Sequence, residues 1–224
     1  VRAAMDDAVV RVPYRARLDA LGVTTALGED DCARSKAMRG DLTALMLKEP
    51  ELAAVFDAVR RTSTSAVASA RVNGKLDVVT DLIQPSCTAA LATYLGIDAD
   101  DADEVFWWAQ LALNRIFLSP SRATATHDYL VESSARAAKD RFAALLQREL
   151  NRMTTRKTAG TLSGTSSPDV LGKLVELGRA KDIDSAMAFA ISLGPHLAWT
   201  TALVLDELLR RQGHVDHAFR AATG

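Results

Sequence analysis

Cysteine is scarce in this chain of 224 residues. The two cysteines, Cys32 and Cys87, lie far apart, and neither belongs to a CxxC or a Cys/His pattern. Structural zinc sites and disulfide scaffolds need closely spaced ligands or pairs of this kind. We therefore expect no metal site and no disulfide framework, and we predict that each cysteine is a small residue in the core or at its boundary.

The chain also lacks an excess of charge of either sign. It holds 27 Lys and Arg against 28 Asp and Glu, which leaves a net charge of -1. Proteins that bind nucleic acid or anionic membrane surfaces present clustered positive charge. Because the arginines are scattered among acids, we interpret them as solvated helix faces and expect neither nucleic acid nor a membrane as a partner.

No apolar run is long enough, without interruption, to suggest a signal peptide or a membrane span. The N-terminal stretch carries Asp6, Asp7 and several arginines, unlike a secretory signal. The most apolar run, 186–205, contains Pro195, His196 and two threonines, whereas a transmembrane helix needs about 20 predominantly apolar residues. We expect a cytoplasmic protein.

Alternation of apolar and polar residues, the pattern of a half-buried strand, is missing as well. Apolar residues recur at helical spacing in almost every segment, and at 48% apolar the chain can bury a sizeable core. We predict a single all-α domain over residues 1–224 with little or no β-structure. A flexible loop is expected at about 158–167, where Gly, Ser and Thr accumulate.

Caps, prolines and glycines predict where the helices begin and end. A break is expected at Pro85, because proline lacks an amide hydrogen. The side chain of Asp98 is expected to cap the helix that follows it by accepting the amide of Asp101. The predicted helices cover residues 29–47, 50–72, 76–96, 98–117, 121–157, 169–178 and 182–211.

The helix predicted at 182–211 is the longest apolar one, and Gly194, Pro195 and His196 interrupt its middle. Proline inside a helix bends the axis at a cost of about 3 kcal/mol, and here it frees a carbonyl near Ile191. His196, Trp199 and Thr200 follow at i, i+3 and i+4. These three side chains are therefore expected on one helix face just past the bend.

We interpret this bend as a candidate ligand pocket. His196 is the candidate catalytic residue, since imidazole can act as an acid or a base near pH 7. An alternative is that His196 is a hydrogen-bonded core histidine and that Trp199 only packs. The candidate substrate-binding residues are Gly194, Trp199, Thr200, Trp108 and Asn114.

Three segments carry a family resemblance, and they read NGKLDVVTDLIQPSCTAALATYLGID, DADDADEVFWWAQLAL and SSPDVLGKLVELGRAKDIDSAMAFAISLGPHLAWTTALVLDELLRR. In their order they resemble the middle of the cytochrome P450 superfamily, especially its bacterial members. The likeness covers about residues 29–212. It implies a P450-like helical core built around one long, kinked central helix.

The chain departs from the family pattern at the residues by which the family binds haem. The family holds haem through a cysteine in a C-terminal Phe-Gly-rich loop that follows a Glu-x-x-Arg helix, and this chain reaches Gly224 without either. Neither Cys32 nor Cys87 has that context. The segment DDCARSKAM lacks the expected His, and Gly194 to Leu197 lack the family's acid and Thr. We therefore expect a truncated, haem-free chain with no cofactor, which is not a functional monooxygenase as it stands.

Three functions stay open on these grounds. The first is a haem-free P450-like protein of natural-product metabolism, which binds an apolar small-molecule intermediate and promotes non-redox cyclisation or isomerisation through His196. The second is a non-catalytic accessory partner of a biosynthetic enzyme such as a glycosyltransferase. The third is a fragment of a monooxygenase, whose uncovered apolar face would lead to aggregation or to a homodimer.

Overall fold

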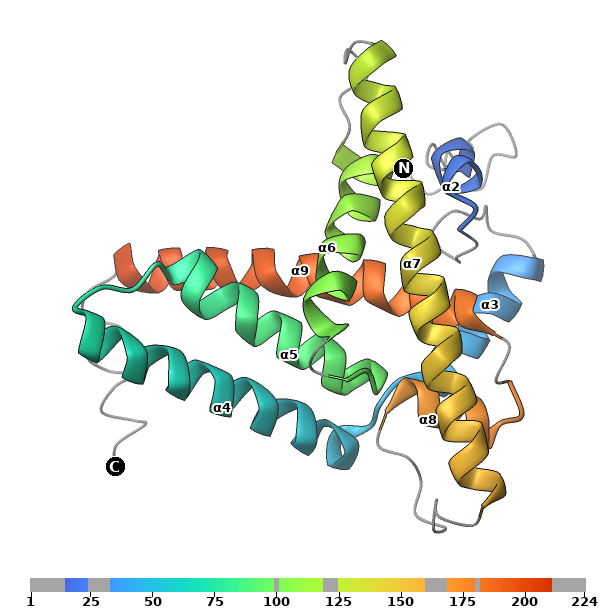
Figure 1. Ribbon diagram of the computed structural model, residues 1–224, viewed down its shortest axis with the longest axis horizontal. Helices are drawn as coiled ribbons and strands as arrows, with labels where there is room; N and C mark the ends of the chain where they lie inside the picture. The colour runs from blue at the N-terminus through green and yellow to red at the C-terminus, as the bar shows by residue number, and fades with distance from the viewer. Residues whose placement is uncertain are drawn as a thin grey trace, which may run out of the picture.

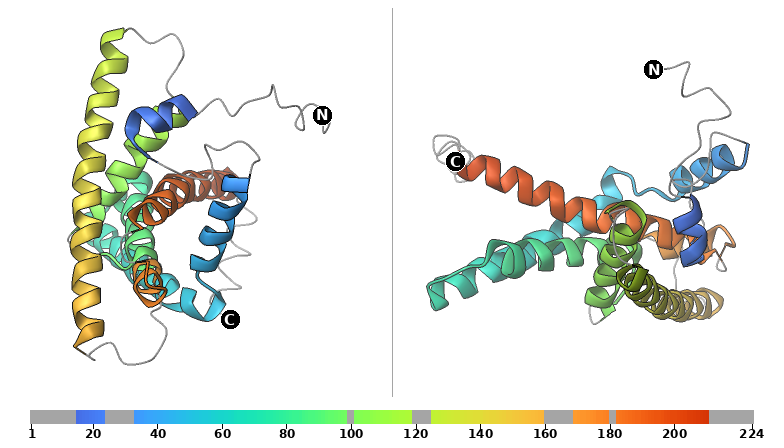
Figure 2. Two further views of the ribbon diagram at one scale, coloured as in Figure 1. Left: turned by 90° about the vertical axis from the view of Figure 1, so that its right-hand side faces the viewer. Right: turned by 90° about the horizontal axis from the view of Figure 1, so that it is seen from above.

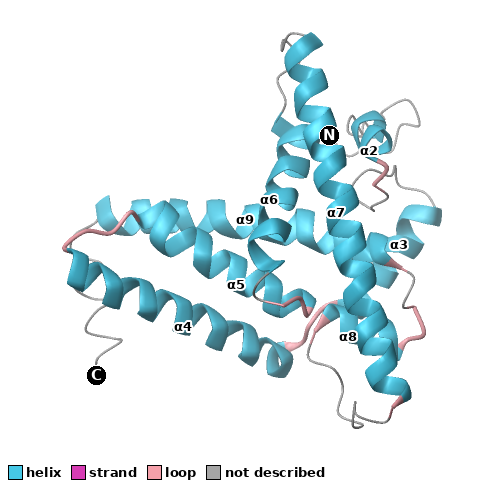
Figure 3. Cartoon of the chain, in the orientation of Figure 1, coloured by secondary structure: helices cyan, strands magenta, loops and turns pink. Residues whose placement is uncertain are grey.

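The computed structural model describes residues 15–23, 33–98, 101–118, 125–159, 169–179 and 182–210. Within these ranges the chain is helical and contains no strand (Figure 3), which confirms the all-α prediction. The elements are, in chain order, α2 (Arg15–Leu21), α3 (Ala33–Leu45), α4 (Glu49–Asn73), the π-helical η2 (Val78–Ile83), α5 (Gln84–Leu95), α6 (Ala102–Leu113), the π-helical η4 (Asn114–Leu118), α7 (Ala125–Thr158), α8 (Val170–Glu176) and α9 (Ile183–Arg210).

Helix α9 lies at the centre of the arrangement (Figure 1). It packs against α5 and α6, while α4 lies along α5 and α7 lies along α6 and α8. Seen from above, α9 and the pair α4 and α5 spread apart towards the C-terminal end of α9 (Figure 2). The two halves of α9 therefore have different surroundings.

The main core surrounds the N-terminal half of α9. Burying a large apolar side chain stabilises a fold by about 1.5–3 kcal/mol, so these residues hold the helices together. Helix α4 adds only Ala58 to the buried set, which makes it a peripheral layer on α5. The largest fully buried side chains are Trp108, Phe142, Leu45, Leu95, Leu113, Ile116, Leu146, Leu150, Leu171, Leu174, Met187 and Ile191.

Local cap chemistry explains several of the observed helix ends. The amide of Lys48 donates to the Glu51 carboxylate at 2.6 Å at the start of α4. Asp169 accepts the amide of Gly172 at 2.7 Å, and Asp182 accepts that of Ser185 at 3.2 Å, as N-cap side chains do. Helix α5 ends at Gly96 with φ +86°, a left-handed conformation that favours glycine. The ends predicted at Asp169, Asp182 and Gly96 are confirmed.

The break predicted at Pro85 takes the form of a π-helical segment. The carboxylate of Asp77 accepts the amides of Val79 and Thr80 at 2.9 Å and starts η2. Pro85 then stands in the first turn of α5, where its missing amide has no intrahelical partner to lose. The chain thus changes its helical pitch at this point and does not leave the helix.

One boundary prediction needs correction. The side chain of Asp98 does not cap α6: its main-chain carbonyl accepts the amide of Asp101 at 3.1 Å, while its carboxylate lies 3.7 Å from Arg152. Helix α7 ends at Thr158, within one residue of the predicted end at 157. Residues 160–167 of the predicted loop, the predicted starts at Glu29 and Ser121, and Cys32 lie outside the described residues.

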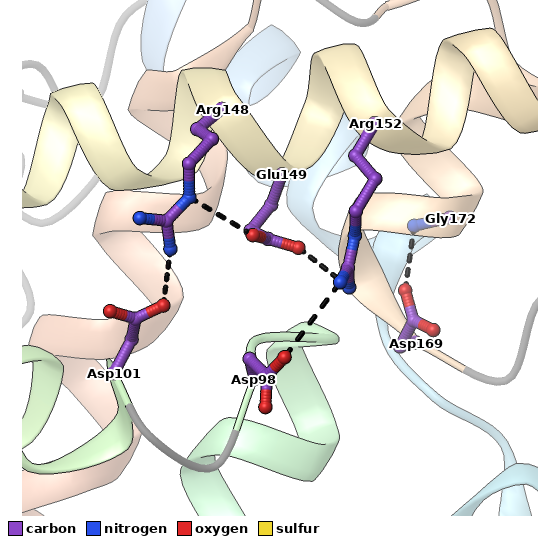
Figure 4. A network of polar contacts seen from close by, with 7 residues as sticks. All are labelled: Asp98, Asp101, Arg148, Glu149, Arg152, Asp169 and Gly172. Carbon is purple, nitrogen blue, oxygen red and sulfur yellow. Dashed lines mark hydrogen bonds and ion pairs between the residues drawn. The ribbon is translucent and has the colours of Figure 1, made fainter.

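Arginines of α7 hold the turn between α5 and α6 through ion pairs (Figure 4). Arg148 contacts Asp101 and, at 3.3 Å, Glu149. Arg152 lies 2.7 Å from the second oxygen of Glu149 and also contacts Asp98. The Glu149 side chain is only 3% exposed, and a buried carboxylate is stable only when paired in this way. This network explains why the side chains of Asp98 and Asp101 make no cap hydrogen bond, although Asp101 is the N-cap residue of α6.

Candidate functional site

Pro195 lies inside α9, and the helix continues on both sides of it. Because proline has no amide hydrogen, the carbonyl of Ile191 loses its usual helical donor. Gly194 and Pro195 are buried, as are the residues from Ala186 to Ile191. The interruption predicted from the sequence therefore lies where the buried half of α9 ends.

Gly194 allows a close approach between helices. A Cβ atom at this position would lie 3.0 Å from Cδ2 of Leu91 on α5 and 3.6 Å from Cβ of Ala109 on α6. From the sequence, the missing side chain is expected to open space for a ligand. In the structure Leu91 occupies that space, so Gly194 lies at a helix contact.

His196, Trp199 and Thr200 lie on the exposed part of α9, as their spacing predicts. The rings of His196 and Trp199 are 6.3 Å apart, at an interplanar angle of 49°. The side chains of His196 and Thr200 are exposed, and Trp199 is 41% exposed. The alternative of a core histidine at position 196 is therefore wrong, while the catalytic role of His196 stays a prediction.

Trp108 and Asn114 are not part of this exposed group. Trp108 is buried in the core, where its ring lies 4.4 Å from that of Phe142 on α7. Asn114 begins η4, and its amide oxygen accepts a long hydrogen bond of 3.5 Å from Gln110. The structure thus brings His196, Trp199 and Thr200 together and places Trp108 between α6 and α7.

Past Pro195, α9 presents apolar side chains that no described element covers. The opposite side of the same half is packed, because Ala198, Ala202 and Leu205 contact the small cluster of Ile83, Cys87 and Phe106. By length and composition alone α9 could cross a membrane, a test that core helices of soluble proteins also pass. We name as the uncovered face of α9 the residues Leu197, Trp199, Leu203, Val204 and Leu208, which are 36–70% exposed.

The sequence predicted an uncovered apolar face only for a fragment of a monooxygenase and did not place it on α9, although a signal for its position exists. A helix that is apolar on all sides is normally buried on all sides. Residues 197–209 are apolar on more than one face, so they need covering from two directions. The described chain provides only one of these covers, through α5, α6 and η2.

Cys87 is the described cysteine that could be considered as a haem ligand, and it does not fit. A thiolate ligand needs a sulfur that is deprotonated and presented towards the iron. Cys87 is 4% exposed, and burial raises the pKa of its thiol, although a hydrogen bond with Thr201 acts in the opposite direction. Its placement in the core confirms the structural role predicted for it. The described residues also include no group of three or more His, Cys, Asp or Glu that could hold a metal ion.

Two solved structures share this arrangement of helices, and both are P450 enzymes. The crystal structure of CalO2 matches with a TM-score of 0.68 and 19% identity, over 96% of this chain and 54% of that chain. The crystal structure of P450BioI in complex with hexadec-9Z-enoic acid ligated acyl carrier protein matches with a TM-score of 0.67 and 14% identity, over 95% of this chain and 54% of that chain.

The chain therefore spans about half the length, 54%, of each solved structure that it matches. No protein-family model and no curated protein matches the sequence. At these identities the likeness establishes the fold alone. The chain has a P450-like fold, as its resemblance to that superfamily implied.

Proposed function

We propose that this protein binds an apolar small-molecule intermediate of natural-product metabolism at the uncovered face of α9 and promotes its non-redox cyclisation or isomerisation. One observation carries the proposal: the exposed imidazole of His196 stands at the start of an apolar helix face that no described element covers. P450BioI, which shares the fold, was solved with a fatty-acid-loaded carrier protein, so the fold is compatible with an apolar substrate.

The chemistry assigned to the site uses only residues of this chain. The imidazole of His196 can take a proton from one carbon or oxygen of the substrate and return it to another. The ring of Trp199, 6.3 Å away, offers an apolar surface and can stabilise a cationic intermediate by a cation–π contact. Thr200 follows on the same face and can hold a substrate oxygen. The uncovered face of α9 then excludes water from one side of the bound molecule.

Turnover by a His196→Ala variant tests this function. The wild-type protein is incubated with apolar terpene and polyketide intermediates, and isomeric products are detected by mass spectrometry. We expect the variant to lose about 100-fold or more in rate, the usual contribution of a general acid or base. Its melting temperature should stay within a few degrees of wild type, because His196 is exposed. An unchanged rate in the variant would remove His196 as the catalyst.

A second candidate function rests on the same exposed face. In this alternative proposal the chain is one half of a P450-type monooxygenase, and further polypeptide covers α9. Its match to 54% of each solved structure favours this. A large uncovered apolar face should then cause self-association. Analytical ultracentrifugation separates the two candidates, because a monodisperse, cooperatively melting monomer contradicts the half-enzyme.

An accessory role is the remaining alternative and uses the same surface. In that case the uncovered face of α9 contacts a biosynthetic enzyme such as a glycosyltransferase. A stable complex that raises the partner's activity, without any turnover by this chain alone, is the expected result. Substituting Leu203 by Glu should weaken that complex, because the exposed Leu203 lies in the uncovered face.

A further inference from the structure

A cavity of about 340 Å³ lies between α4, α5 and the start of α6. Its apolar lining includes Ala89, Ala92 and Ile97. Its polar lining consists of Arg61 and Thr62 from α4, Thr88 and Thr93 from α5, and Asp103 from α6. This volume falls in the range of small-molecule sites, which combine an apolar lining with a few polar groups. The uncovered face of α9 contributes no residue to it.

Thr88 supplies the observation that points to a ligand. The residue is 5% exposed, and its hydroxyl has no hydrogen-bond partner in the described part of the chain. Helical threonines usually bond to the carbonyl four residues back, and Thr154, Thr155 and Thr201 do so at 2.7–3.0 Å. A buried hydroxyl without a partner is costly. The hydroxyl oxygen has almost no accessible surface, so a rotation of the Thr88 side chain towards the cavity that the residue lines would let a bound molecule supply the missing hydrogen bond.

Two opposite charges at the cavity restrict the class of ligand. Arg61 and Asp103 come from different helices, both are exposed, and neither forms an ion pair with another described residue. A lone anion would meet the carboxylate of Asp103, and a lone cation would meet the guanidinium of Arg61. A molecule that carries both charges can match both groups. The apolar lining between them leaves room for a compact hydrocarbon group.

We propose that this cavity binds a small zwitterion, an α-amino acid with a compact apolar side chain. Arg61 donates hydrogen bonds to the ligand's carboxylate, and Asp103 accepts them from its ammonium group. The ligand's side chain contacts Ala89, Ala92 and Ile97. The hydroxyl of Thr88 hydrogen-bonds to the ligand at the bottom of the site.

Titration of the ¹⁵N-labelled chain with L-valine, followed by NMR, tests the proposal. We expect saturable shifts at the amides of Thr88, Thr93 and Asp103. Isobutylamine and 3-methylbutanoate, which each keep one of the two charges, should bind about 10-fold more weakly or worse, because each lacks one charge-assisted hydrogen bond. Absence of saturable shifts with L-valine up to about 10 mM, a concentration well above millimolar affinity, overturns the proposal.

Three variants locate the site. Arg61→Gln and Asp103→Asn should each weaken L-valine binding about 10-fold without unfolding the chain, because both side chains are exposed. Thr88→Val keeps the shape of the side chain and removes its hydroxyl, so it should weaken binding several-fold. If Thr88→Val only raises the melting temperature and leaves the affinity unchanged, the hydroxyl does not serve a ligand and the proposal fails. Failure here leaves the function proposed for α9 untouched.

Discussion

Replacement of Gly96 by alanine tests the packing of α8 against the end of α5. Gly96 has φ +86°, and an added Cβ would lie 2.5 Å from Cγ of Asp169 and 3.1 Å from its Cβ. The left-handed conformation alone costs an L-residue about 1–2 kcal/mol. The new methyl group must also displace Asp169, whose carboxylate accepts the amide of Gly172 at 2.7 Å.

Loss of that N-cap costs about a further 0.5–2 kcal/mol. The total expected for Gly96→Ala is therefore about 1.5–4 kcal/mol, a large share of the roughly 5–15 kcal/mol that stabilise a typical domain. Gly74→Ala is the matched control, since Gly74 also ends a helix in the left-handed region, at φ +71°, with nothing within 4 Å of an added Cβ. It should cost only about 1–2 kcal/mol.

Urea unfolding followed by circular dichroism measures both variants, and a double-mutant cycle with Asp169→Ala isolates the contact. The Asp169→Ala background removes the carboxyl group but keeps the Cβ atom 3.1 Å from the added one, so the cost of Gly96→Ala should fall towards that of Gly74→Ala. Equal costs for the two glycine variants in the wild-type background would refute the close approach of Asp169 to Gly96. The reasoning about how α8 is held would then be wrong.

Two further predictions concern charge and core packing. The hydrogen bond from Lys173, followed by that from the Lys48 amide, lowers the pKa of Glu51 from its ordinary value of 4.5. A carboxyl group whose pKa is lowered in the folded state stabilises the fold above its unfolded pKa, and this contribution is lost as the pH falls through the folded pKa. Glu51→Gln should therefore reduce the loss of stability on acidification below about pH 4.5. Chemical denaturation between pH 3 and 7 checks this, and identical pH profiles of the two proteins would contradict it. Trp108→Phe should change the unfolding free energy by about 1 kcal/mol or less, because it removes a buried indole N–H that has no partner in the described residues. Trp108→Ala should cost about 3–5 kcal/mol. Equal losses in these two variants would show that the indole N–H is satisfied.

The predictions that succeeded depend on neighbours within a few residues. Asp169, Asp182 and Gly96 end or begin helices through bonds to amides and carbonyls close in sequence. Pro85 likewise acts on its own turn. The family resemblance supplied the tertiary arrangement, which periodicity alone does not contain.

The predictions that failed depend on distant partners. Asp98 has the composition of a cap, but Arg152 on α7 competes for its carboxylate. Gly194 was expected beside open space, and only the packed structure shows Leu91 in that position. The site roles predicted for Trp108 and His196 stay predictions, because helical spacing fixes neighbours on one helix only and does not say which side of α6 faces α9.

The accessibility of Trp199 tests the central claim most directly, namely that α9 past Pro195 offers an uncovered apolar face to a ligand. The fluorescence difference between Trp107→Phe and the double variant Trp107→Phe/Trp199→Phe isolates Trp199 and removes Trp107, which is also exposed. The account predicts red-shifted emission that acrylamide quenches readily, with a blue shift and protection when farnesol is added. Emission from Trp199 that is already blue-shifted and protected without a ligand would contradict it.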